Sequence, residues 1–409
     1  MKYKNEVIIT IIIAILVLFL RYINVLQIEN TLGTPIAMIL FIMCFSIITI
    51  YIQKNIDTNY EHGTFYYKNL DILKYVSAIL IMILHLRPFI NFSNELDLAF
   101  NNIITRICVP IFFIITGYFV AKKEKDNPNY INEYIKRTIP LYITWSILYL
   151  PVIISTLIEY MPIINTYIQD FNISFVWLLV ILILLLPVVV LIALCYTGVY
   201  YHLWYFPALM LSLIVLKKWK NKFSLKLLLY ISLLLLLFGA TETYFGVLPE
   251  TFQNLLSYYY NIFFTTRNFL FFGLFYVVLG YFMGNKKQIY SKNCFLKLIV
   301  SIFLLIFEAI LLHDTNRLNS NILISCIPLT YYLFISIIYI TNNIENKFQY
   351  STYSKYYYLI HPMIIYIVSI VLKNINNYPY PNILLVLIAT HICTILIIKL
   401  KQKKLFHNL

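Results

Sequence analysis

The sequence predicts an all-α polytopic membrane protein with about 12 transmembrane helices and one further segment that is re-entrant or interfacial. Hydrophobic residues make up 61% of the 409 residues and charged residues only 12%, whereas roughly a quarter of a soluble domain is charged. The apolar runs are continuous rather than alternating, which favours membrane helices over a membrane β-barrel.

Thirteen apolar segments are long enough to be candidate spans. They lie near residues 7–24, 34–52, 70–91, 102–121, 138–158, 174–196, 202–217, 224–240, 268–284, 295–312, 321–342, 356–373 and 383–401. Lysine-rich loops tend to face the cytoplasm, and applying this rule along the chain places both termini there. The rule leaves two segments, 174–196 and 202–217, where one crossing is needed, so one of them is expected to dip into the membrane or lie along it.

The net charge of +14 comes from lysines in short clusters between apolar runs. This distribution orients helices in a lipid bilayer and does not indicate a nucleic-acid partner. Six cysteines are scattered without a CxxC pair, so neither a metal site nor a disulfide framework is predicted. Phosphate-binding, dinucleotide-binding, zinc-protease and nucleophile-elbow motifs are absent from the sequence, which argues against those chemistries.

The loop at 53–69 is the best candidate for a domain boundary. It separates residues 1–65, predicted to form a transmembrane helix pair and a cytoplasmic loop, from residues 66–409. The second part holds most of the polar residues that fall inside apolar runs. Its longest outer connection, 241–267, is rich in aromatic residues, which is typical of a membrane interface.

The helix predicted at 70–91 carries three ionisable residues near one face, Asp71, Lys74 and His85. Lys74 is expected near the cytoplasmic surface and His85 well past the bilayer midplane. Lys74 could simply extend to the lipid headgroups, and His85 could hydrogen-bond a neighbouring helix. Intramembrane ionisable groups are costly to insert, and for His85 this favours a functional role.

Arg106, in the next predicted helix, lies four or five residues below the outer surface. Arginine keeps its charge, so Arg106 needs an anionic partner unless it extends outward to the headgroups. Glu308 falls inside an apolar run and also needs a partner, for which Arg106 or Arg267 would serve. His391 has no polar neighbours nearby in sequence and is expected to pack in the helix bundle.

Further polar residues mark the outer side and the later helices. His202 and Trp204 belong to the ambiguous region and could line a cavity there or simply sit at the interface. Arg267 and Asn268 begin a helix at its outer end. His361 is expected near the cytoplasmic end of its helix.

Five stretches resemble blocks of the type 3 integral-membrane acyltransferase family. LDILKYVSAILIMILH matches a signature in which an aspartate is followed three positions later by a basic residue and fourteen later by a histidine. RICVPIFFIITGYFVAKK is similar to the family's Arg-x-x-Val-Pro-x-Phe-Phe block. HLWYFPAL, RNFLFFGLFYVVLG and YLIHPMIIY are most similar to the membrane domain attached to vancomycin-resistance serine racemases. The resemblance covers about residues 66 to 401 and implies a ten-helix core.

The resemblance implies transfer of an acyl group, often acetyl, from acetyl-CoA or another acyl-CoA in the cytoplasm. The acceptor would be a hydroxyl or amine of a cell-envelope glycan, lipid or amino acid at the outer face, and no metal is implied. His85 takes the position of the catalytic histidine, and Arg106 that of the family's arginine. Lys74, with Asp71, stands where the family has an arginine and would attract the phosphates of CoA.

His202, Trp204, Arg267, Asn268, Glu308 and His361 are then expected to contact the acceptor or support the catalytic residues. The alternative that the sequence leaves open is a transporter or flippase for a small amino acid or an envelope precursor. Ionisable groups in a membrane cavity suit that function too. Against it, the sequence has no evident inverted repeat.

Overall fold

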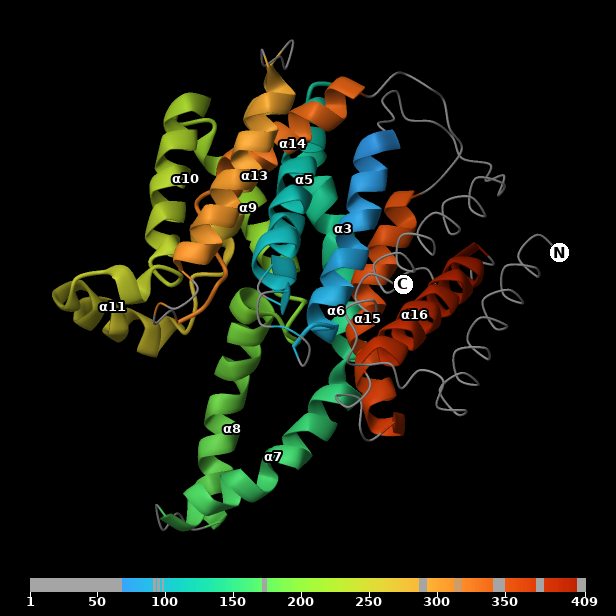
Figure 1. The fold of residues 1–409 in the computed structure, drawn as a ribbon. Helices are drawn as coiled ribbons and strands as arrows, with labels where there is room; N and C mark the ends of the chain where they lie inside the picture. Colours follow the sequence, from blue (N-terminus) through green and yellow to red (C-terminus); the bar gives the residue numbers. More distant parts are fainter. Residues whose placement is uncertain are drawn as a thin grey trace. The chain divides into compact units, whose positions relative to one another are not determined.

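The computed structural model describes residues 68–402 with internal gaps. The gaps are residues 91–95 apart from 93, residue 98, residues 171–174, 287–292 and 341–349, residues 313–317 apart from 315, and residues 373–378. The predicted helix pair in residues 1–65 lies outside the described residues. Helices account for the regular structure of the described part (Figure 1), which confirms the predicted all-α membrane fold.

The chain divides into two compact units. Unit 1 comprises residues 1–112 and 288–405, and unit 2 comprises residues 113–287 and 406–409. The predicted boundary at residues 65 and 66 lies outside the described residues and stays a prediction.

The described helices of unit 1 are α3 (Lys68–Leu86), α13 (Cys294–Leu311), α14 (Cys326–Ile340), α15 (Tyr350–Leu372) and α16 (Pro379–Gln402). α15 packs against both α3 and α16, and α13 packs against α14 (Figure 1). Lys74 contacts Ser354 and, further along both helices, His85 contacts His361, so α3 and α15 are parallel. This agrees with the sequence-based topology, in which both run from inside to outside.

α3 ends where the backbone of Arg87 takes a left-handed conformation, with φ of 43°. Pro88 follows and has no N–H to continue the helical hydrogen bonds. The Arg87 guanidinium is paired with Asp97 at 2.6 Å, and Asn101 donates to the same carboxylate. The predicted span 70–91 therefore ends at Leu86, one residue after His85.

The chain returns through irregular helix before α5 (Cys108–Glu124) begins. A π-helical turn, η1 (Ala99–Ile104), leads into a 3₁₀ turn, η2 (Thr105–Ile107), which carries Arg106. Pro110 cannot donate a hydrogen bond to the carbonyl of Arg106, which removes one hydrogen bond that a regular α-helix would have at that turn. Irregular turns of this kind are frequent at functional sites.

Unit 2 contains most of α5, followed by helices that run to residue 285. These are α6 (Tyr130–Leu148), α7 (Leu150–Asp170), α8 (Phe175–Ile192), the π turn η3 (Ala193–Thr197), α9 (Tyr205–Trp219), α10 (Leu225–Ala240), the 3₁₀ turn η4 (Phe245–Val247), α11 (Glu250–Phe263), the π turn η5 (Phe269–Gly273) and α12 (Leu274–Asn285). α12 packs against α9 and α10, and α6 packs against α9.

Two sequence-based boundaries in unit 2 are corrected. The predicted span 138–158 is broken at Tyr149, where α6 and α7 bend by 42°. The predicted outer loop 159–172 is helical as far as Asp170. Its polar residues are spaced widely enough that an apolar face persists through the segment, which the loop assignment overlooked.

Glycines allow α5 and α12 to approach within backbone contact. A Cβ on Gly117 would lie 2.1 Å from the carbonyl oxygen of Val277, and one on Gly280 would lie 2.1 Å from that of Ile114. No other residue fits at either position without moving a backbone. Small residues commonly serve this purpose between membrane helices.

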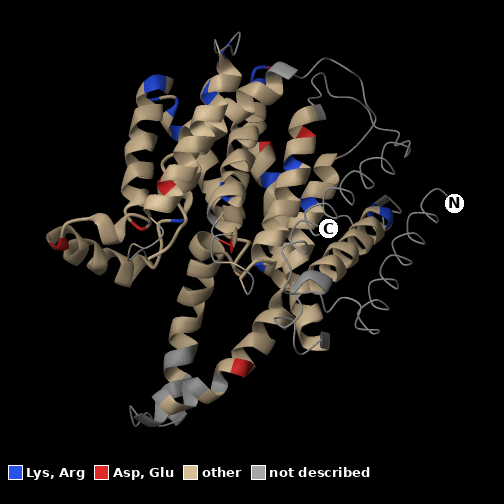
Figure 2. Cartoon of the chain, in the orientation of Figure 1, with Lys and Arg blue, Asp and Glu red and all other residues tan. Residues whose placement is uncertain are grey.

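Four described helices are long and apolar enough to cross a membrane, and the bent α6–α7 pair provides a fifth. The four are Asn69–Leu86, Ala99–Glu124, Cys294–Leu311 and Asn382–Lys401. Four shorter apolar helices accompany them. α8 carries no charged residue, and α10 carries its single lysine in the first turn (Figure 2). The chain is a multi-pass membrane protein, and the count of 12 spans stays a prediction.

Candidate functional site

In unit 1, two histidines from different helices lie face to face. The rings of His85 on α3 and His361 on α15 have centroids 5.5 Å apart and planes inclined by 18°. His361 is fully buried, whereas His85 is half-buried. The structure therefore places one accessible imidazole against a buried one, at the same level of two parallel helices.

The position of His361 is fixed by its own helix. Its Nδ1 lies 2.9 Å from the carbonyl oxygen of Tyr357, which can only accept, so Nδ1 carries the proton. In the neutral ring, Nε2 is then the unprotonated nitrogen. Pro362 follows and leaves the carbonyl of Tyr358 without its helical N–H donor, and the His361 ring hydrogen-bonds to that backbone as well. His361 is the twelfth residue of α15, which corrects its expected place near the helix start.

A buried hydrogen-bond chain lies on the same helix pair. Tyr75 on α3 donates to Tyr357 on α15 at 3.4 Å, and the Tyr357 hydroxyl lies 2.6 Å from Nδ1 of His391 on α16. Ser354 also donates to the carbonyl of Lys74 at 3.0 Å. His391 does pack in the bundle, as expected, but it has a polar partner that its sequence neighbours did not reveal.

The two residues predicted to meet the donor, Asp71 and Lys74, are paired with each other. The Lys74 ammonium donates to the Asp71 carboxylate at 3.1 Å, one turn apart on α3. The Lys74 side chain is 21% exposed and that of Asp71 10% exposed. The pair is formally neutral, so Lys74 presents less positive charge to a phosphate than a lone lysine would.

Arg106 and Glu308 both lie near the start of α14. The Glu308 carboxylate accepts hydrogen bonds from the backbone N–H groups of Ile324 at 2.6 Å and Ser325 at 2.7 Å. η2, which carries Arg106, packs against α3 and α14. The charges of Glu308 and Arg106 both act on the thiol of Cys326. The sequence suggested Arg106 or Arg267 as the partner of Glu308. The structure shows that backbone N–H groups also hydrogen-bond to its carboxylate.

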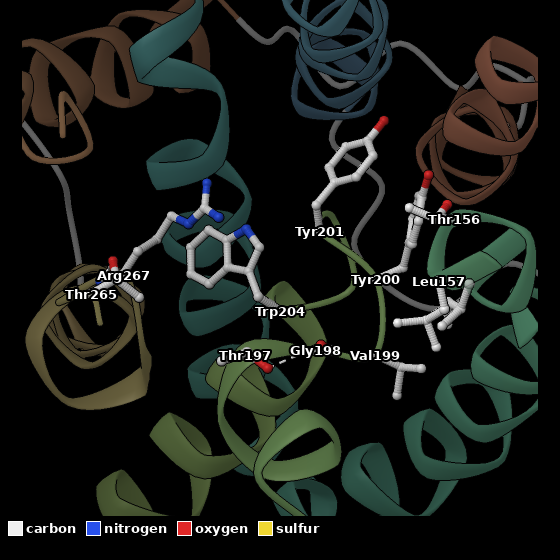
Figure 3. A pocket seen from close by; sticks show the side chains of 11 residues that line it. Thr156, Leu157, Thr197, Gly198, Val199, Tyr200, Tyr201, Trp204, Thr265 and Arg267 are labelled. Carbon is white, nitrogen blue, oxygen red and sulfur yellow. Dashed lines mark hydrogen bonds between the residues drawn. The ribbon is translucent and has the colours of Figure 1, made fainter. Parts of the chain in front are cut away.

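In unit 2, a partly open pocket of about 440 Å³ lies beside Arg267. It is lined by Ile153, Thr156, Leu157, Thr197, Gly198, Val199, Tyr200, Tyr201, Trp204, Thr265 and Arg267. The guanidinium of Arg267 lies over the Trp204 indole, 5.0 Å from the ring centre. Figure 3 shows this pair on one side of the pocket and Tyr200, Thr156 and Leu157 on the other.

A buried carboxylate holds the turn that precedes Arg267. Glu242 is 2% exposed. It accepts one hydrogen bond from the hydroxyl of Thr265, one from the hydroxyl of Thr266, and one from the Thr266 backbone N–H at 2.8 Å. The Thr265 hydroxyl oxygen in turn accepts from the Arg267 backbone N–H at 3.0 Å. Sequence analysis did not single out Glu242. The sequence feature that could have identified Glu242 is an acidic residue between two threonines at the end of an apolar helix.

Asn268 has a structural role in the same turn. Together with Glu242, Thr265 and Thr266 it forms a hydrogen-bonded group that we call the frame. Its side-chain oxygen accepts from the backbone N–H groups of Leu270 and Phe271 and so caps η5. Its amide donates to the hydroxyl of Tyr196 at 3.1 Å. Asn268 is 2% exposed and absent from the pocket lining.

α11 covers part of this frame. The hydroxyl of Tyr260 on α11 lies 2.8 Å from that of Thr241. Burial raises the pKa of Tyr260 to about 12, so this phenol is protonated at neutral pH. The opposite face of α11 exposes Phe252, Leu255, Tyr258 and Ile262, which fits the predicted interfacial segment.

His202 lies beneath the pocket rather than in its lining. It is 2% exposed, and its ring packs edge-on against Tyr149 at 4.9 Å and against Tyr201 at 5.7 Å. Gly198 has a φ of 77° and lets the loop pass close to the start of α9. A Cβ on Gly198 would lie 2.3 Å from the backbone nitrogen of Trp204. The loop thereby brings Tyr200, Tyr201 and Trp204 to one pocket.

Comparison with known proteins adds a family and three relatives. The family model described as an acyltransferase domain matches residues 67–399. Two amino-acid racemases of Enterococcus faecalis are each 26% identical, over 66% and 82% of this chain, which cover 35% and 46% of those proteins. A serine/alanine racemase of Enterococcus gallinarum is 25% identical over 80% of this chain and 46% of its own length.

The chain thus spans between about a third and a half of the length of the curated relatives it matches. No solved structure matches it.

Proposed function

Because the chain belongs to the acyltransferase-domain family, we propose that it is a membrane enzyme that transfers an acyl group from a cytoplasmic CoA thioester to a cell-envelope acceptor. Acetyl is the first candidate for the acyl group. The acceptor offers a hydroxyl or an amine at the outer face, with both termini of the chain in the cytoplasm. The observation that carries the proposal is the stacked pair of His85 and His361.

His85 is proposed as the general base. Its half-buried imidazole is accessible to an acceptor, and the ring of His361 fixes its plane from the buried side. As the acceptor oxygen or nitrogen attacks the thioester carbonyl, His85 takes its proton, and that proton then passes to the leaving thiolate. Positioned proton transfer of this kind contributes about a hundredfold to ten-thousandfold in rate.

Arg106 is proposed to stabilise the oxyanion of the tetrahedral intermediate. It lies in the same unit as the histidine pair, on a turn that packs against α3. A fixed cation directed at developing negative charge is worth about 3 kcal/mol in comparable sites. Glu308 supports this arrangement by holding the start of α14, against which the same turn packs.

Lys74 is proposed to help attract the phosphates of CoA, together with the lysines of the cytoplasmic loops. Its pairing with Asp71 limits this contribution. We therefore expect that replacing Lys74 raises the KM for the donor less than removing several loop lysines together.

The test is acetyl transfer by the purified full chain in lipid vesicles, with radiolabelled acetyl-CoA and cell-envelope glycan as acceptor. We expect His85→Ala to abolish transfer, and His391→Asn, which changes a buried histidine outside the stacked pair, to retain most of it. Transfer at the parental rate by folded His85→Ala protein would falsify the assignment of the base.

The same vesicles separate acyl transfer from transport. Serine and alanine are the compounds to test, because one relative is named a serine/alanine racemase. Uptake of labelled serine or alanine by the vesicles without acyl-CoA, together with no transfer of acetyl, would replace the enzyme by a transporter. Mass spectrometry of cell-envelope acetylation with and without the gene then identifies the acceptor.

A further inference from the structure

The pocket beside Arg267 has the size of a small-molecule site. Its volume of about 440 Å³ lies toward the lower end of the range for ligand pockets, roughly 300 to 1,000 Å³. That space accommodates one sugar ring with a substituent. All of its lining residues belong to unit 2.

Charge in the pocket is of one sign. Among the described residues that line it, Arg267 is the one that carries a charge, and none is acidic. Glu242 lies behind the turn, where it accepts hydrogen bonds from Thr265 and Thr266. A guanidinium presents a planar fork of donors that matches a carboxylate or a phosphate. The pocket therefore favours an anion and offers no carboxylate to a free ammonium group.

The remaining lining is aromatic, hydroxylic and, at Ile153, Leu157 and Val199, aliphatic. Tyr200, Tyr201 and Trp204 bring ring surfaces to the pocket, and Thr156, Thr197 and Thr265 bring hydroxyl groups (Figure 3). Aromatic rings cover the apolar C–H faces of a sugar. The hydroxyl groups of Thr156 and Thr197 donate to the backbone carbonyls of Val152 and Gly198, so their oxygens can accept hydrogen bonds from the hydroxyl groups of a sugar. An aliphatic acid would use the arginine but has no donor for these oxygens.

We propose that this pocket binds a single sugar unit that bears one anionic group, with the anion on Arg267 and the sugar ring against Tyr200, Tyr201 and Trp204. The inference rests on the proposed function, because this sugar is then the recognition unit of the acceptor glycan. A zwitterionic amino acid fits less well, since its ammonium group would meet Arg267 and no counter-charge among the lining residues.

The test is saturation-transfer NMR on the purified full chain in detergent, a method suited to weak ligands. The probes are glucuronic acid, glucose 6-phosphate, glucose and serine. We expect glucuronic acid or glucose 6-phosphate to bind at least about tenfold more tightly than glucose, because each charged hydrogen bond contributes roughly a factor of ten or more. The stronger of the two identifies the anion as carboxylate or phosphate.

Arg267→Gln should reduce this preference for the anionic sugar to about the level of glucose, whereas Arg267→Lys should retain part of it. Tyr201, 39% exposed, provides a second variant that leaves the buried frame intact. Tyr201→Ala should weaken binding of all three sugars, and Tyr201→Phe should not. Folding of each variant is checked by its elution profile and melting temperature.

The proposal is overturned if glucose binds as tightly as the anionic sugars, if folded Arg267→Gln keeps the preference, or if serine binds most tightly. His85→Ala separates this proposal from the proposed function. It should bind the anionic sugar as the parent does, because His85 belongs to unit 1. Binding of the sugar by a parent chain that transfers no acetyl would support the pocket and contradict the acyltransferase.

Discussion

The histidine pair of unit 1 and the arginine pocket of unit 2 hold their ionisable groups in opposite ways. His361 is fully buried in the interface of two parallel helices, where ring stacking and hydrogen bonds to the backbone of its own helix fix it. Arg267 stands on a loop at the edge of a partly open pocket. The first arrangement leaves no exposed surface on His361 and suits precise positioning of a neighbouring base. The second leaves space and suits recognition.

The difference also lies in what supports each group. The histidines depend on the packing of α3 against α15, which lies within a helix bundle. Arg267 depends on a turn that one buried carboxylate, Glu242, holds through its hydrogen bonds to Thr265 and Thr266. Changes in unit 1 should therefore affect the chemical step, and changes in unit 2 should affect the affinity for the acceptor.

Among the residues that support the proposed base and the pocket, the largest effect is expected from His361→Phe. Phenylalanine keeps a ring against His85 but removes the nitrogen that bonds to the Tyr357 carbonyl. We expect kcat to fall about a hundredfold, or about 2.7 kcal/mol, with the KM for the acceptor unchanged. Steady-state kinetics in vesicles measure this, with His391→Phe as the control. An equal loss in both variants would mean that the bundle, and not the pair, was disturbed.

Glu242→Ala comes next. It leaves buried hydroxyl and N–H donors without their acceptor, and we expect a loss of about 2 kcal/mol of stability. The melting temperature in detergent measures this, and the KM for the acceptor should rise as the turn loosens. Glu242→Gln keeps one acceptor oxygen and should lose less. A variant as stable as the parent would contradict the proposed frame.

Arg267→Gln should have a smaller effect and one of a different kind. We expect the KM for an anionic acceptor to rise about tenfold, since a charged hydrogen bond is lost, while kcat stays within about a factor of two. A fall in kcat at saturating acceptor would instead place Arg267 in the chemical step.

The smallest effect is expected from Tyr75→Phe. Its hydrogen bond to Tyr357 is long, at 3.4 Å, and Tyr357 keeps its shorter bond to His391. We expect a loss of about 0.5 kcal/mol in stability and no change in kcat. A large fall in kcat would show that the tyrosine chain takes part in proton transfer.

The helices of this fold could be predicted because lipid forces the backbone to satisfy its own hydrogen bonds within long apolar runs. The break at Tyr149 and the extension of α7 to Asp170 were not predicted. The polar residues of 159–172 were interpreted as a loop, although their spacing leaves an apolar face on a helix.

The candidate site shows the same limit. His85 and Arg267 stand out in the sequence because each is ionisable and lies in or beside an apolar run. The partner of His85 lies far along the chain, on α15, and only the packed structure brings the two rings together. His202 and Asn268 stand out in the sequence for the same reason. In the structure both are buried, and neither lines the pocket.

In this proposal unit 1 carries the chemistry and unit 2 carries the recognition of the acceptor. The most direct test is the rate of acetyl transfer as a function of acceptor concentration for the parent, His361→Phe and Arg267→Gln. We predict that saturating acceptor restores the rate of Arg267→Gln and leaves that of His361→Phe low. Restoration of His361→Phe, with Arg267→Gln remaining slow, would contradict the claim.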